Sequence, residues 1–116
     1  MTRSRLTAAG IALVVNLLVL YWPKTTDAGA GVPHLDKVVH VASFAALAWS
    51  CLRAQLPVRW VLPLLGVHAV LSEVVQHVAL PRRSGDPADA IADVTGVLVG
   101  TVLARASWTR DREEQG

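Results

Sequence analysis

Apolar residues dominate four stretches of this chain, and each stretch has the length of a short membrane-buried helix. The stretches cover residues 6–22, 36–52, 60–80 and 87–104. A membrane span needs about 20 mostly apolar residues, and fewer where the bilayer thins around a protein. The sequence therefore predicts an all-α integral membrane bundle of four short transmembrane helices in a single domain, residues 1–116. The charged residues 107–116 are predicted to form a flexible tail.

A water-soluble bundle and a cleaved secretory signal are the two competing interpretations. Hydrophobic residues make up 53% of the chain, and residues 6–22 are interrupted only by Asn16, which leaves no polar stripe for water. This favours the membrane. Arg3 and Arg5 precede the first apolar stretch, and the Ala-Gly-Ala triplet at 28–30 resembles a signal cleavage site. The stretch is longer than the usual signal core, which favours a retained span.

Charge and cysteine content exclude several classes of protein and orient the helices. The net charge of +2 is too small to indicate a nucleic-acid partner, and Cys51, as the single cysteine, excludes an internal disulfide. Cytoplasmic loops of membrane proteins are enriched in arginine and lysine, so the side with more of them is predicted to be cytoplasmic. With both termini inside, the inner side collects Arg3, Arg5, Arg53, Arg59, Arg105, Arg110 and Arg112. The outer side then holds Lys24, Lys37, Arg82 and Arg83.

Most of the polar residues within the apolar stretches are predicted to meet near the outer face. The second stretch begins there, the third ends there and the fourth begins there. Charged side chains within the hydrocarbon cost on the order of 3 kcal/mol each, so they usually pair, face a wet cavity and mark function. The predicted ligand-binding residues are Asp36, Lys37, His40, Glu73, Gln76, Arg82, Arg83, Asp89 and Asp93.

Some of these residues have a simpler structural explanation. Asp36 and Asp89 suit the first turn of a helix, as a cap or at the positive end of the helix dipole, and Asp86 suits an N-cap. Arg82 and Arg83 also suit interfacial anchors, and His68 a packed or hydrogen-bonded histidine.

Glu73 has no such explanation. It lies seven residues before Leu80, about 10 Å from the end of its helix, beyond the reach of a cap or dipole. Glu73, His40 and Asp93 are therefore the candidates for a catalytic role, although the reaction and any metal or cofactor stay open.

This pattern resembles the VanZ-like family of small bacterial membrane proteins. The resemblance covers residues 6–104 and rests on Asp36, Lys37, His40, Phe44, Glu73, Gln76, Arg82, Arg83, Asp86, Asp89, Gly96 and Gly100. It implies a four-helix domain in the bacterial cytoplasmic membrane and a link to the cell envelope. The founding member accompanies glycopeptide-resistance genes and is associated with reduced susceptibility to teicoplanin. The family often has Asn where this chain has Asp93, which puts a role carried over to Asp93 in doubt.

Four functions are compatible with these residues. The preferred one is binding, without turnover, of a lipid-linked or phosphate-bearing envelope ligand at the outer face, since arginine and lysine bind phosphate and carboxylates bind sugars or amines. The alternative is an intramembrane, metal-dependent hydrolase or transferase acting on an envelope lipid or peptidoglycan precursor. A proton-coupled transporter is disfavoured because the polar residues do not cross the bilayer. The fourth interpretation is a purely structural ion-pair cluster. Gly96 and Gly100 also offer a surface for a homo-oligomer, which the sequence does not distinguish from packing within the chain.

Overall fold

The protein is a bundle of four helices, shown by a computed structural model that describes residues 3–21, 35–79 and 87–115. The helices are α1 (Arg3–Tyr21), α2 (Leu35–Arg53), α3 (Val58–Ala79) and α4 (Pro87–Gln115). The all-α prediction is confirmed. Residues 22–34 and 80–86, which join α1 to α2 and α3 to α4, lie outside the described residues.

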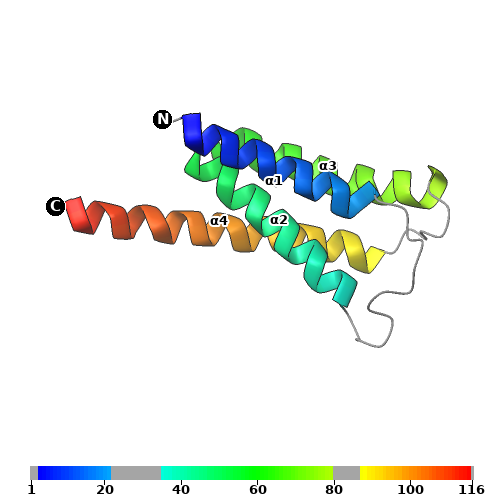
Figure 1. Cartoon of the computed structure of the whole chain (residues 1–116). Helices are drawn as coiled ribbons and strands as arrows, with labels where there is room; N and C mark the ends of the chain where they lie inside the picture. The colour runs from blue at the N-terminus through cyan, green and yellow to red at the C-terminus, as the bar shows by residue number, and fades with distance from the viewer. Residues whose placement is uncertain (1–2, 22–34, 80–86, 116) are drawn as a thin grey trace.

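The helices run alternately up and down, so that the two chain ends lie at the same end of the bundle (Figure 1). The opposite end gathers the end of α1, the start of α2, the end of α3 and the start of α4. These are the helix ends where the sequence places its carboxylates and imidazoles. The up-and-down topology therefore brings the predicted polar residues to one level of the bundle.

The surface of the bundle is apolar in a way that suits lipid. The most exposed of the large apolar residues include Ile11, Val38, Trp60, Leu64, Val78, Ile91 and Val102. Three helices are long and apolar enough to cross a membrane: α1, α3 and residues Ala88–Arg110 of α4. Membrane insertion is thus supported by these three, while α2 is not among the candidate spans in the described part of the chain.

The closest helix contact joins α2 to α4 through a row of small residues. Buried small side chains recur every fourth residue along α4, at Ala92, Gly96, Gly100 and Ala104. A Cβ added at Gly96 would collide with the carbonyl oxygen of Val41 and lie 2.9 Å from the Phe44 Cβ. Small residues at this spacing let two helix backbones approach closely.

The same geometry places the two glycines inside one chain. A Cβ at Gly100 would collide with the carbonyl oxygen of Ala45 and lie 2.9 Å from the Ala48 Cβ. Both glycines are therefore covered by α2. A homo-oligomer through Gly96 and Gly100 would have to displace α2 from this position.

The fourth helix is longer than the sequence indicated. The predicted helix ended at Ala104 and was followed by a flexible tail, whereas α4 continues to Gln115. Residues 105–115 include three arginines and two glutamates, which favour helix, and neither proline nor glycine interrupts them before Gly116. Apolarity marks only the end of the membrane-buried part of a helix, so the apolar pattern did not indicate the polar continuation. The flexibility of residues 107–116 stays a prediction.

The turn between α2 and α3 is closed by backbone hydrogen bonds. Leu56 N–H donates to the Cys51 carbonyl at 3.2 Å, and Gln55 N–H donates to the Leu52 carbonyl at 3.0 Å. This pair of bonds is the Schellman ending of a helix, which places the residue after the helix in the left-handed region. That residue is Gln55, with a φ of 65°.

Candidate functional site

Two layers of charged side chains lie between α2, α3 and α4 at the end of the bundle away from the chain termini. We call Lys37 and Asp89 the outer pair, and His40, Glu73 and Asp93 the inner triad; together they form the polar cluster. In the outer pair, Lys37 Nζ lies 3.0 Å from Asp89 Oδ1. The side chain of Lys37 is 29% exposed and that of Asp89 11%. The outer pair is thus the part of the cluster that a ligand reaches first.

The inner triad lies one turn deeper and is buried. His40 is 3% exposed, Glu73 8% and Asp93 0%. His40 and Asp93 share a hydrogen bond of 2.6 Å between Nδ1 and Oδ1. Each of the three residues offers one ligand atom, and these atoms lie within 4.8 Å of one another. Three different helices therefore converge on one small volume.

Helix geometry explains why these three residues meet. His40 lies five residues after the start of α2, Asp93 six after the start of α4, and Glu73 six before the end of α3. At 1.5 Å per residue, all three lie about 8 to 9 Å from their helix ends. Carboxylates at this depth in a bilayer are costly unless they pair or face a polar cavity. The sequence argument for Glu73 thus agrees with its observed depth and burial.

A third polar layer, which the sequence analysis did not assign to the site, lies deeper in the bundle. His68 Nε2–H donates to Asn16 Oδ1 at 2.8 Å, and the Asn16 amide donates to Ser43 Oγ at 3.2 Å. Ser43 Oγ in turn donates to the His40 carbonyl at 3.1 Å. The prediction of a packed or hydrogen-bonded His68 is confirmed, and its ring also lies 5.5 Å from that of Phe44. The signal for Asn16 was its position as the single polar residue of an apolar stretch.

Below this layer the described bundle core is mostly apolar. The buried residues there include Leu47, Ala48, Leu52, Val61 and Leu65. Among the described residues, the buried polar side chains at this level are the hydroxyls of Ser50 and Thr101, so the charged groups of the cluster do not continue through the described core.

Gln76, a predicted ligand-binding residue, has a structural contact of its own. Its Nε2 donates to the carbonyl oxygen of Leu20 at 2.8 Å, and the side chain is 1% exposed. The last four carbonyls of a helix lack partners within that helix, and Leu20 belongs to the last turn of α1. Gln76 thus caps α1 and holds α1 against α3.

Three predicted site residues cannot be placed in this arrangement. Arg82 and Arg83 lie outside the described residues, and so does the side chain of Asp36, although its backbone begins α2. Within the described part of the chain, Lys37 is the one lysine or arginine at this end of the bundle.

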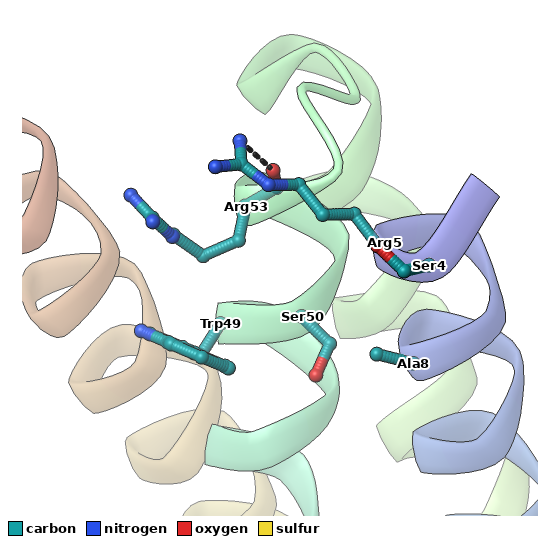
Figure 2. A pocket seen from close by; sticks show the side chains of 6 residues that line it. All are labelled: Ser4, Arg5, Ala8, Trp49, Ser50 and Arg53. Carbon is teal, nitrogen blue, oxygen red and sulfur yellow. Dashed lines mark hydrogen bonds between the residues drawn. The ribbon is translucent and has the colours of Figure 1, made fainter. Parts of the chain in front are cut away.

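The opposite end of the bundle is basic. A hollow of about 180 Å³ lies between α1 and α2 there, lined by Ser4, Arg5, Ala8, Trp49, Ser50 and Arg53 (Figure 2). Arg5 Nη1 donates to the carbonyl oxygen of Arg53 at 3.1 Å and so caps α2. The structure therefore separates a basic end, which also contains the termini, from an end rich in carboxylates and imidazoles.

Comparison of the chain with protein-family models, with curated proteins and with solved structures found no match. The resemblance to the VanZ-like family rests on the sequence motifs alone.

Proposed function

We propose that this chain is a multi-pass membrane protein of the cell envelope that binds the headgroup of a lipid-linked, phosphate-bearing ligand at the polar cluster. The observation that carries the proposal is the layering of the cluster, in which the partly exposed Lys37 pairs with Asp89 above a buried triad. Charged side chains at such a depth are costly to insert into a membrane, and they are therefore typical of a functional site.

The membrane arrangement is part of the same proposal. The helix α2 contacts α1, α3 and α4, and it runs alongside α4, which is itself a candidate span. We therefore propose that α2 also crosses the membrane and that all four helices are transmembrane. The basic end, with Arg5 and Arg53, is assigned to the cytoplasm of a bacterial cell because arginine is enriched on that side. A reporter active only in the cytoplasm, fused at the C-terminus, tests this assignment.

The outer pair suits a zwitterionic or sugar-phosphate headgroup. Lys37 supplies a cation for phosphate, while the Asp89 carboxylate accepts hydrogen bonds from hydroxyl or amine groups. Lys37 already pairs with Asp89, so a bound phosphate competes with this carboxylate for the ammonium group. Removal of Asp89 should consequently not weaken phosphate binding, whereas removal of the lysine charge should.

The experiment measures binding of a short-chain polyprenyl phosphate to the purified protein in detergent, with the corresponding polyprenol as the ligand without phosphate. We expect the phosphate form to bind more tightly, and Lys37→Met to weaken its binding about tenfold or more. Thr95→Ala is the matched control, because Thr95 is exposed on α4 and bonds only the Ile91 carbonyl of its own helix in the described contacts. Equal affinity for the two ligands would refute the proposed ligand class.

The resemblance to the VanZ-like family adds a cellular test. The chain is expressed in a glycopeptide-sensitive bacterium, and teicoplanin susceptibility is compared between the natural chain and Glu73→Gln at matched membrane levels. Protection by the natural chain alone would identify the inner triad as the functional part of an envelope factor. Equal protection by both would make Glu73 structural, and no protection by either would remove resistance from the proposed function.

The enzyme alternative is favoured by one observation, the convergence of an imidazole and two carboxylates in the inner triad. Such a set is able to activate water for attack on a phosphoester or amide. Release of phosphate or of a shortened product from a polyprenyl-diphosphate substrate, abolished by Glu73→Gln, would favour the hydrolase or transferase over simple binding.

A further inference from the structure

We infer that His40, Glu73 and Asp93 form a binding site for a divalent transition-metal ion of the zinc class. One residue comes from each of α2, α3 and α4, and their three candidate ligand atoms lie within 4.8 Å of one another. Zinc–nitrogen and zinc–oxygen bonds are about 2.0 to 2.2 Å long, so ligand atoms around one ion lie about 3.3 to 3.6 Å apart. Small side-chain rotations that shift each ligand atom by less than about 1 Å bring the distances between these atoms into the range for zinc.

The second observation is an oxygen atom of Asp93. The residue is 0% exposed, and its Oδ2 makes no hydrogen bond within the described part of the chain. A buried carboxylate oxygen without a donor is costly, because a carboxylate needs compensation for the water that it loses. The other oxygen, Oδ1, contacts His40, which directs the carboxylate into the triad. A cation between the three side chains would supply the missing interaction.

The donor set agrees with the chemistry of such an ion. One imidazole and two carboxylates give three protein ligands, the number that catalytic zinc sites use while they leave a fourth position open. The described part of the polar cluster holds three carboxylates and one lysine, so a divalent cation reduces the excess of negative charge in a low-dielectric setting. The open position would face the outer pair, from which a ligand enters.

The competing explanation is that the His40–Asp93 hydrogen bond only fixes the position of α2 against α4. This explanation needs no ion, but it does not account for the position of Glu73 beside His40 and Asp93. The two explanations differ in a direct measurement, the metal content of the protein.

The test uses the full chain purified in detergent, exposed to Zn²⁺ or Co²⁺ and freed of excess metal by gel filtration. We expect about one ion per chain, a Co²⁺ absorption spectrum in the visible range typical of a four-coordinate site, and a higher melting temperature with Zn²⁺ than without it. Glu73→Gln and Asp93→Asn should each weaken the affinity about 100-fold or more, since even outer-shell changes cost up to about 100-fold. Asp93→Asn keeps a polar side chain of the same shape beside His40, and circular dichroism checks that each variant folds.

Cys51→Ser and His77→Ala are the matched controls, because both residues are metal ligands by type and lie outside the triad. They should bind Zn²⁺ as the natural chain does. Absence of bound metal from the natural chain would overturn the inference, as would binding that persists in both triad variants or is lost in a control. The inference does not depend on the proposed ligand, since the metal is measured without any polyprenyl phosphate present.

Discussion

The contact between α2 and α4 provides a sharp test of the packing that forms the site. Replacing Gly96 or Gly100 with alanine adds one Cβ to a helix that is already in close contact with its neighbour. At Gly96 the new atom meets the Val41 carbonyl oxygen, and at Gly100 it meets that of Ala45. Both obstacles are backbone atoms of α2, which cannot rotate away as a flexible side chain does. The two helices must therefore move apart.

The expected cost follows from two opposing contributions. Adding a methyl group to a tightly packed contact costs about 1 to 3 kcal/mol, and a backbone obstacle places these two positions near about 3 kcal/mol. Exchange of glycine for alanine within a helix stabilises the folded protein by about 1 kcal/mol, because alanine loses less backbone entropy on folding. We expect each substitution to lower the free energy of unfolding by about 2 kcal/mol, about a 30-fold change in the unfolding equilibrium.

The chain contains matched controls for the same chemical change. A Cβ added at Gly10 in α1 or at Gly66 in α3 has no other atom within 4 Å. Alanine there should be neutral or stabilise by up to about 1 kcal/mol. The assay is unfolding in detergent micelles by increasing SDS, followed by far-ultraviolet circular dichroism. Equal effects at Gly96 and at Gly10 would refute the close contact of α2 and α4.

A functional consequence follows from the position of Gly96. Asp93 lies one turn before it on α4, and His40 directly precedes Val41 on α2. If the two helices move apart at this crossing, the 2.6 Å contact between His40 and Asp93 lengthens. Gly96→Ala should therefore weaken both metal binding and ligand binding, whereas Gly66→Ala should leave them unchanged.

Three further substitutions test other contacts, each measured by the same unfolding assay. Asn16→Ala removes the hydrogen bond from α1 to His68 and should lower the free energy of unfolding by about 1 to 2 kcal/mol. A destabilisation smaller than that of an alanine substitution at an exposed position would contradict the buried network. Gln76→Leu leaves the Leu20 carbonyl without its donor and should also cost about 1 to 2 kcal/mol. Gln55→Gly should stabilise by about 0.5 to 1 kcal/mol, because glycine adopts a positive φ without strain, and a loss of stability would contradict the Schellman ending.

Much of the architecture was predictable because lipid exposure imposes a simple pattern. Long apolar stretches predicted helices, and the alternation of direction then brought the polar ends of residues 36–52, 60–80 and 87–104 together. The four-residue spacing of Gly96 and Gly100 indicated a close helix contact, within the chain or with a second copy. The atoms that an added Cβ would meet, the carbonyl oxygens of Val41 and Ala45, place α2 at that contact. These features depend on period and composition, which a single sequence displays directly.

Side-chain pairing was not predictable in the same way. The sequence brought Lys37, His40, Asp89 and Asp93 to one level of the bundle without pairing them, whereas in the structure Lys37 pairs with Asp89 and His40 with Asp93. The choice depends on the rotation of each helix about its own axis. The small residues of α4 set that rotation by directing one face against α2, and a linear sequence does not display it.

The inner triad joins Glu73 of α3 to the tightly packed pair of α2 and α4. The small residues bind α4 closely to α2, and this pair alone holds Lys37 near Asp89 and His40 near Asp93. Glu73 belongs to α3, which contacts all three other helices and is tied to α1 by the Gln76 cap and by the bond between His68 and Asn16. Any ion or headgroup that contacts the whole triad therefore adds a direct link from α3 to α2 and α4. Such a ligand should stabilise the docking of α3 on α2 and α4 more than it stabilises the α2–α4 contact, because that contact has its own tight packing.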